Sequence, residues 1–203
     1  MGMQVTKTEG TELHPLFFKI FDDIPGGVTL KASDLKTATE ELEAGAIIGE
    51  DGSTSGLYHL IKTAEVYEDV SSGTDIKVEK EHEFKVGDFI SNGNSSSAIT
   101  AIDADETAYD TITVTNGFAC NDGDILYQST SEGTEAADVA LKYTPSAITK
   151  NTVAKITYTA SGSRTETNVT VAAVVRGTVN ESLLPFVVHA DIKTALTDRI
   201  LFA

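Results

Sequence analysis

Short runs in which apolar and polar residues alternate constrain the fold of this chain more than any other feature. Such runs lie at residues 98–103, 111–115, 153–160 and 166–171. A period of two residues is typical of strands with one face buried and the other in water. The chain also has 27 threonines among its 203 residues, and branched side chains lose less freedom on a pleated sheet than in a helix. We therefore predict a mainly β fold.

Two hairpins are expected from the turns between apolar runs. Residues 46–49 and 57–61 flank the polar turn 50–56, and residues 153–160 and 166–171 flank the turn 161–163. One helix of two or three turns is expected near Thr37 and Glu40, which have the spacing of a capping box. The stripe for this helix consists of Leu35, Ala38 and Leu42.

The C-terminal part is predicted to hold two further short helical segments. Asn180 can cap a helical turn that ends at Pro185. A helix beyond it is indicated by an apolar stripe made of Ile192, Ala195, Leu196 and Ile200. The chain ends on Ile200-Leu201-Phe202-Ala203, and an end this apolar is expected to dock on the fold or on a neighbour.

Charge is distributed unevenly along the chain. The 31 acidic and 15 basic residues give a net charge of −16, of which residues 1–65 carry −6, residues 66–128 carry −10 and residues 129–203 carry none. The middle part also contains an internal repeat, in which a Gly-Asp turn precedes an apolar pair at 84–90 and again at 120–126. We predict that 66–128 form a small antiparallel barrel or sandwich inserted into a discontinuous β domain of residues 1–65 and 129–203.

The charge also bears on partners. A strongly negative chain repels phosphate backbones and anionic lipid surfaces, so neither nucleic acid nor membrane is an expected partner. We expect the acidic middle to face solvent and the uncharged last third to face protein; the alternative, that the acidity only keeps the protein soluble, stays open. No apolar run approaches about 20 residues, and the start lacks the pattern of an export signal. Met1 and Gly2 before Met3 are consistent with a cloning remnant.

The patterns of catalytic and metal sites are incomplete in this sequence. The four histidines lie far apart, Cys120 has no second cysteine, and the calcium-loop pattern that starts at Asp103 lacks its glycine and its final glutamate. The segment 121–124 favours a turn closed by its own side chains over a cation site. The glycine frame 52–56 has Thr54 where a nucleophile elbow has serine. We therefore expect no cofactor, no metal and no enzymatic activity.

An apolar segment at residues 13–21 provides a candidate contact surface. With Phe17, Phe18 and Phe21 it can add a strand to the open sheet edge of a partner, or it can fill the core of the protein itself. Both interpretations remain open from the sequence.

Two stretches resemble one known family. Residues 174–185, with Arg176, Gly177, Asn180 and Leu183, resemble the C-terminal part of tailed-phage head-decoration proteins. Residues 42–51, followed by 55–58, are similar to the glycine-led entry hairpin of that family. The resemblance implies a small β-rich subunit that binds the major capsid protein on the outer capsid surface, commonly as a homotrimer, with an N-terminal arm on the shell. It also implies structural and not catalytic roles for the four named residues. The 66–128 module resembles the outward-facing extra domains of head fibres.

The expected function is therefore that of a structural virion protein, made in the bacterial host cytoplasm and placed on the capsid surface. The expected contact residues are Leu16, Phe17, Phe18, Phe21, Arg176, Gly177, Asn180, Leu183, Leu184 and Phe186. One alternative is a carbohydrate-binding module or adhesin, favoured if Tyr58, Tyr67 and Tyr109 line one groove. Another is a hydrolase, favoured if a deep pocket gathers carboxylates from separate strands.

Overall fold

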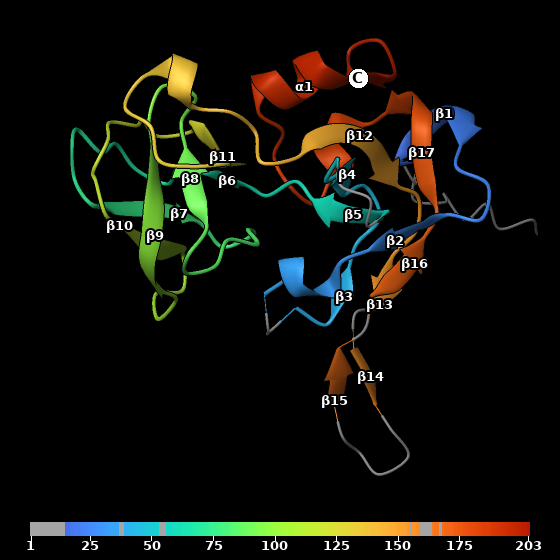
Figure 1. The fold of residues 1–203 in the computed structure, drawn as a ribbon, viewed down its shortest axis with the longest axis horizontal. Coiled ribbons are helices and arrows are strands. Elements are labelled where there is room, and N and C mark those ends of the chain that lie inside the picture. Colours follow the sequence, from blue (N-terminus) through green and yellow to red (C-terminus); the bar gives the residue numbers. More distant parts are fainter. Residues whose placement is uncertain (1–14, 37–38, 53–55, 155, 159–163, 167) are drawn as a thin grey trace, which may run out of the picture.

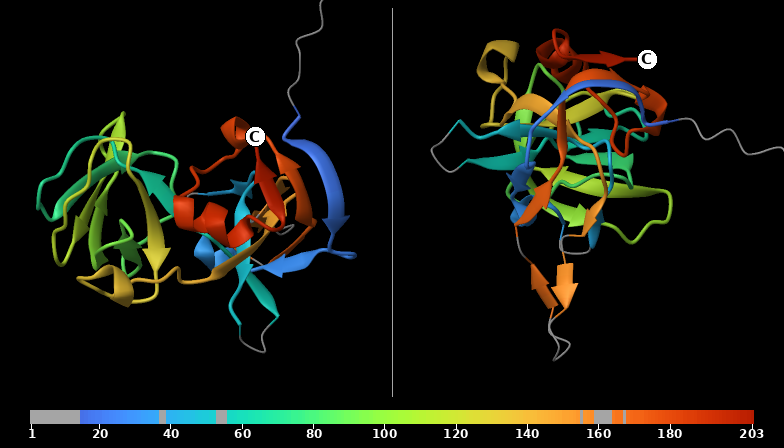
Figure 2. Two further views of the ribbon diagram at one scale, coloured as in Figure 1. Left: turned by 90° about the horizontal axis from the view of Figure 1, so that it is seen from above. Right: turned by 90° about the vertical axis from the view of Figure 1, so that its right-hand side faces the viewer.

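The chain folds into two β lobes that lie side by side (Figures 1 and 2). The computed structural model describes residues 15–36, 39–52, 56–154, 156–158, 164–166 and 168–203, and within 156–166 it describes the backbone only. Strands dominate and helices are few and short, so the mainly β class predicted from the alternating runs is confirmed. The first 14 residues, which include the start of the predicted arm, lie outside the described part.

The first lobe, called the sheet lobe, is built on one curled eight-stranded sheet. Its strand order is β1-β17-β12-β4-β5-β2-β16, and β18 pairs in parallel with β17. The strands are β1 (Phe17–Asp23), β2 (Val28–Leu30), β4 (Ile47–Glu50), β5 (Leu57–Leu60), β12 (Thr144–Thr149), β16 (Val169–Val171), β17 (Ala173–Val179) and β18 (Ile200–Phe202). The pairing of β4 with β5 confirms the first predicted hairpin.

Two small sheets extend the sheet lobe. In one, β3 (Glu41–Leu42) pairs with β13 (Val153–Ala154), and in the other β14 (Ile156–Tyr158) pairs with β15 (Arg164–Glu166). The second pair is a hairpin near the other predicted one, but its second strand lies at 164–166 and not at the predicted 166–171. Residues 169–171 instead form β16, which pairs with β2. The turn at 161–163 lies outside the described residues. The apolar chain end docks on the fold as β18, as expected.

The second lobe, called the barrel lobe, is an antiparallel six-stranded sheet in the order β6-β11-β8-β9-β10-β7. An isolated bridge joins Val66, just after β6, to Val78 of β7, so the first and last strands of the order approach each other and the sheet curls into a partly closed barrel. The strands are β6 (Thr63–Glu65), β7 (Asp75–Glu79), β8 (Phe89–Ser91), β9 (Ser96–Asp103), β10 (Tyr109–Val114) and β11 (Ile125–Ser129). In the chain these strands lie between β5 and β12 of the sheet lobe.

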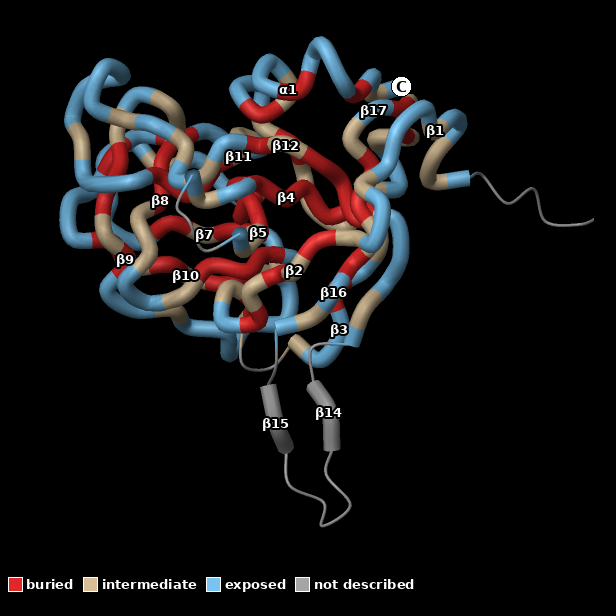
Figure 3. The backbone as a smooth tube through the Cα atoms, turned by 45° about the vertical axis from the view of Figure 1, so that its right-hand side comes forward, coloured by how far each residue is buried: buried red, intermediate tan, exposed pale blue. Residues whose placement is uncertain are grey.

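Each lobe has its own hydrophobic interior, visible in Figure 3 as buried segments at its centre. The barrel core includes Ile76, Phe84, Ile112 and Leu126, and none of its members comes from the sheet lobe. The curled sheet packs one face around Leu30, Ile48 and Leu60, and its other face against the helix α1 (Ala190–Leu196).

The repeated Gly-Asp segments form two equivalent turns in the barrel lobe. In each turn glycine has positive φ, 91° at Gly87 and 80° at Gly123. The carboxylate of the following aspartate accepts a hydrogen bond from the backbone N–H three residues earlier, Lys85 to Asp88 at 3.0 Å and Asn121 to Asp124 at 2.7 Å. Only glycine adopts this backbone conformation without strain, so the repeat in the sequence is a repeat of turn geometry.

The helix predicted around Thr37 and Glu40 is wrong in the part that the structure describes. A single 3-10 turn, η1 (Ala32–Asp34), ends at Leu35, whose φ of −78° and ψ of 149° are extended. Leu42 lies in β3 and pairs with Val153. Both leucines are buried, as the stripe required, but strand pairing with a distant segment overrides the local helical pattern.

The predicted C-terminal helix is shorter than its stripe. Ile192 and Leu196 are buried on α1, whereas Ala195 is exposed and Ile200 belongs to β18. Two other 3-10 turns complete the helical content of the described chain, η2 (Ala136–Asp138) and η3 (Glu181–Leu183).

Gly177 offers a test of how closely β1 packs on β17. A Cβ atom at this position would lie 2.6 Å from the carbonyl oxygen of Lys19. We expect Gly177→Ala to cost about 1–3 kcal/mol of unfolding free energy and to lower the thermal midpoint by about 5 °C. The control is Thr178→Ala in the same strand, with a change below about 2 °C. Equal midpoints for the wild type and Gly177→Ala would contradict the close approach.

Candidate functional site

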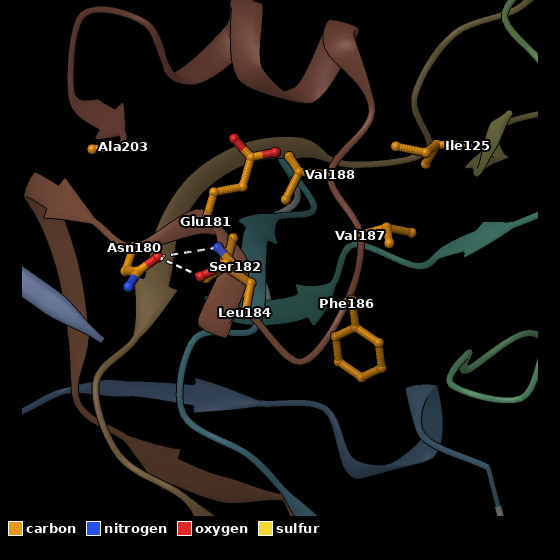
Figure 4. Close-up of a pocket in the computed structure, with 9 residues that line it drawn as sticks. All are labelled: Ile125, Asn180, Glu181, Ser182, Leu184, Phe186, Val187, Val188 and Ala203. Atoms are coloured by element: carbon orange, nitrogen blue, oxygen red, sulfur yellow. Dashed lines mark hydrogen bonds between the residues drawn. The ribbon is translucent and has the colours of Figure 1, made fainter. Parts of the chain in front are cut away.

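The end of the sheet lobe runs along its junction with the barrel lobe. We call residues 184–188, between η3 and α1, the junction strap. The strap borders a hollow of about 730 Å³ (Figure 4). The hollow is lined by Ile125, Asn180, Glu181, Ser182, Leu184, Phe186, Val187, Val188 and Ala203. Ile125 comes from the barrel lobe and the other residues from the sheet lobe.

Local sequence sets the path of the chain into the strap. The side-chain oxygen of Asn180 accepts hydrogen bonds from the N–H of Ser182 at 3.2 Å and from its hydroxyl at 2.8 Å, which caps η3. Pro185 follows two residues after η3 and has no N–H with which to continue a helix. The cap and the stop predicted from the sequence are confirmed here.

The start of the strap is fixed to the segment before β1. The N–H of Asn180 donates to the carbonyl of Leu16 at 2.8 Å. Gly45, whose φ is 98°, lies next to these residues. A Cβ atom on Gly45 would be 3.2 Å from the side chains of both Leu16 and Leu184. Three segments distant in sequence therefore meet at this point.

The charged group in the hollow already has partners. The carboxylate of Glu181 forms an ion pair with Lys193 at 2.5 Å. The backbone N–H of Glu181 donates to the carbonyl of Ala203 at 3.0 Å. Most of the remaining lining is aliphatic or aromatic. Such a hollow suits apolar side chains of another protein better than a charged small molecule.

The ten expected contact residues fall into two groups. Leu16, Asn180, Leu183, Leu184 and Phe186 lie at or beside the strap, and four of these five are half-buried while Leu183 is exposed. The other five lie on β1 and β17.

The second group belongs to an edge of the sheet. β1 pairs only with β17 among the described strands, so this chain uses the described part of the predicted arm in its own sheet. Phe17 is half-buried, while Phe18 and Phe21 are 51% and 57% exposed. Arg176 is exposed and forms an ion pair with Asp22 at 3.2 Å, and Gly177 permits the close approach of β1.

Buried charged groups at the lobe junction were not found from the sequence. The carboxylate of Glu83, in the barrel lobe, accepts hydrogen bonds from the N–H of Lys36 at 2.5 Å and from the hydroxyl of Thr39 at 2.7 Å. Lys85 of the barrel lobe donates to the carbonyl of Ser33. These contacts fix the segment after η1 to the barrel lobe.

His82 and Asp110 continue this network inside the barrel lobe. The N–H of Phe84 donates to Nδ1 of His82, and Nε2 lies 3.0 Å from Asp110 and 3.2 Å from Nζ of Lys36. Asp110 also forms ion pairs with Lys80 at 2.7 Å and Lys36 at 3.5 Å. Because both ring nitrogens have partners, His82 has no free lone pair with which to act as a general base.

Burial and charge shift the pKa values in this network. Burial and the charge on Lys36 lower the pKa of His82 to about 4, against the attraction of Asp110. Burial also lowers the pKa of Lys36. For Asp110, burial acts to raise the pKa, but Lys80, Lys36 and His82 outweigh it and lower the value.

A second pair of buried charges holds the strand connection into the barrel. Lys62, almost fully buried, forms an ion pair with Asp88 at 2.7 Å, and the side-chain amide of Gln128 donates to the other oxygen of Asp88 at 2.6 Å. Asp88 is the aspartate of the first repeated turn. The repeat thus also anchors the chain where it enters and leaves the barrel lobe.

His59 is the centre of a third polar group. Its Nδ1 lies 2.8 Å from Asp34, its Nε2 lies 3.4 Å from Asp51, and its ring stacks on Tyr143 at 4.0 Å. Burial and the charges of Asp34, Asp88 and Asp51 raise the pKa of Tyr143 to about 12. None of the hollows described here is lined by His59.

Within the described part of the chain, no three His, Cys, Asp or Glu side chains are grouped so as to hold a metal ion. At 121–124, Asp124 accepts a hydrogen bond from the N–H of Asn121, and the N–H of Asp122 donates to Asp69. These contacts match the turn-closing interpretation. No described helix has the length and apolar character needed to cross a membrane.

The conditions set for the two alternative functions are met only in part. Tyr67 and Tyr109 pair on the barrel lobe with ring centroids 5.1 Å apart, but Tyr58 packs against the core of the sheet lobe. Carboxylates from separate strands do gather at the junction. Those of Glu41, Glu79 and Glu81 are exposed, so they do not form an acid–base pair shielded from water.

Comparison with known proteins gives no relative: no family model, curated protein or solved structure matches this chain. The geometry of the chain itself therefore carries the functional argument.

The pKa of His82 predicts how stability depends on pH. The unfolded chain binds a proton at His82 near pH 6.5 and the folded chain only near pH 4, so folding stability is lost as pH falls between these values. The loss reaches about 3 kcal/mol at about 1.4 kcal/mol per unit. We expect His82→Gln to remove this share of the pH dependence in urea unfolding at pH 7.0 and pH 4.5. If both proteins lose the same stability over this range, His82 is not the responsible group.

Proposed function

We propose that this chain is a structural protein of a tailed-phage virion, which binds the major capsid protein and stabilises or decorates the outer surface of the capsid. Its role is binding and not catalysis. The proposal unites the sequence resemblance at residues 174–185 with the surface of the sheet lobe.

The distribution of exposed apolar side chains is the observation that carries the proposal. Four large apolar side chains, Phe18, Phe21, Leu183 and Leu201, are exposed on the sheet lobe. The hollow at the strap adds further apolar surface beside Leu183. By contrast, residues 66–128 carry a net charge of −10. A lobe that offers apolar contacts and a lobe that repels its own copies suit a subunit that binds a shell and shows its acidic side outward.

A subunit that binds the assembled shell in preference to dispersed shell proteins stabilises that shell by mass action. Contacts repeated by symmetry add up, so each contact can be weak. This is why apolar patches without an enclosed ligand pocket support the proposal.

The second candidate is a carbohydrate-binding module or adhesin. The paired rings of Tyr67 and Tyr109, with the Lys77 ammonium 4.8 Å from the Tyr109 ring centroid, favour it. We place it second because Tyr58, the third tyrosine of the expected groove, lies in the other lobe.

Leu183→Asp tests the shell contact. Leu183 is 43% exposed, so the substitution should leave the fold intact while placing a charge in the contact. We expect at least about tenfold weaker binding to expanded heads in a sedimentation assay, corresponding to about 1.4 kcal/mol. The matched control is Val86→Asp, at a 62% exposed valine of the barrel lobe, which should bind normally. Normal binding by Leu183→Asp would remove the strap from the contact.

The oligomeric state is a separate test. A homotrimer of 21.5 kDa chains has a mass of about 65 kDa, three times the chain mass. We expect sedimentation equilibrium to give this value at micromolar concentration. A monomer at all concentrations would contradict the trimer.

A further inference from the structure

Beside the junction strap lie two more hollows, about 390 and 280 Å³ in volume, which share Lys80, Glu81 and Pro185 and therefore adjoin each other. We call them together the junction trough. The trough is lined by Lys36, Thr39, Glu41, Leu42, Glu43, Glu65, Glu79, Lys80, Glu81, His82, Glu83, Leu184, Pro185, Phe186 and Val187.

The lining of the trough carries unbalanced negative charge. Its two lysines, Lys36 and Lys80, both lie within ion-pair distance of Asp110, and Glu83 accepts hydrogen bonds from the other lobe. These four charged groups cancel one another. Five further glutamates remain, and in the described part of the chain none of them has an ion pair; they are Glu41, Glu43, Glu65, Glu79 and Glu81.

The trough also has an apolar lining. It is formed by the strap side chains Leu184, Pro185, Phe186 and Val187 and by Leu42 of β3, which lies between Glu41 and Glu43 in the chain. Carboxylates and hydrocarbon therefore line the same trough. A peptide segment that carries both basic and aliphatic side chains matches this combination.

We propose that the junction trough binds an extended protein segment in which Lys or Arg residues are interspersed with aliphatic residues. Unpaired carboxylates attract the basic side chains, and the strap removes the aliphatic ones from water. The same charge repels phosphate groups, so a nucleic acid strand does not fit. The identification of the segment as part of the major capsid protein rests on the proposed function. The preference of the trough for a basic and aliphatic segment rests only on its lining residues.

Three hexapeptides test the proposal on the full-length protein. The probe is fluorescein-labelled Lys-Val-Lys-Val-Lys-Val, and the controls replace all valines by serine or all lysines by glutamate. We expect saturable binding of the first in fluorescence anisotropy, binding at least about tenfold weaker for the serine peptide, and none for the glutamate peptide. Affinity should fall as salt rises from 50 to 500 mM. Equal binding of the valine and serine peptides would indicate non-specific attraction and would overturn the proposal.

Matched variants locate the binding. Glu41→Gln/Glu43→Gln/Glu81→Gln removes three trough charges, and Glu50→Gln/Glu135→Gln/Asp198→Asn removes three exposed charges that do not line the trough. Both proteins have the same net charge. We expect the first to lose at least about tenfold in affinity for the valine peptide and the second to keep it. Equal affinities of the two variants would overturn the assignment to the trough.

The head-binding and peptide assays separate the two proposals. Peptide binding at the trough without binding to heads would reject the capsid role and keep the peptide site. Head binding without peptide binding would keep the capsid role and reject the trough as a site for a basic segment.

Discussion

The two lobes are joined by buried charges that have partners on the other side of the junction. Glu83 of the barrel lobe accepts two hydrogen bonds from the segment after η1, and Lys62 before β6 pairs with Asp88. Removing one partner of such a pair leaves an uncompensated buried charge, which commonly costs about 3–5 kcal/mol. The relative position of the lobes, and with it the shape of every hollow beside the strap, depends on these pairs.

This fixed junction gives the inserted barrel a definite orientation. Lys62, just before the entry strand β6, and Gln128 of the exit strand β11 both contact Asp88, so neither connection is a free linker. A barrel held in this way extends the sheet lobe as a rigid neighbour. The trough exists because Glu65, Glu79 and Glu81 of the barrel lobe meet Glu41, Glu43 and the apolar strap of the sheet lobe.

The separate cores of the two lobes allow the acidic surface to lie on the barrel lobe and the exposed apolar side chains discussed above to lie on the sheet lobe. The barrel buries its own core and needs nothing from the sheet lobe to do so, which leaves its exterior free to carry acidic residues. The sheet lobe keeps large apolar side chains on its edge strand and near the strap. In the proposed role, the first surface prevents self-association and the second makes the contacts.

Alternation of apolar and branched residues was sufficient to predict the mainly β class, the hairpin of β4 and β5, and the strands at 98–103 and 111–115. The partner of 166–171 was predicted wrongly, since β16 pairs with the distant β2. The Gly-Asp pairs at 87–88 and 123–124 likewise predicted two local turns, and Asn180 and Pro185 predicted the cap and the end of η3. These features depend on backbone conformation within a few residues. The short helix near Thr37 was predicted wrongly, since Leu42 gains a strand partner 111 residues away. The burial of His82, Asp110 and Glu83, with the half-buried Lys36 beside them, could not be predicted from the sequence, because charged residues are usually exposed to water. Only the tertiary structure brings these four side chains together. The desolvation and the pairing of a charged group depend on neighbours from distant parts of the chain, which meet only when the chain folds.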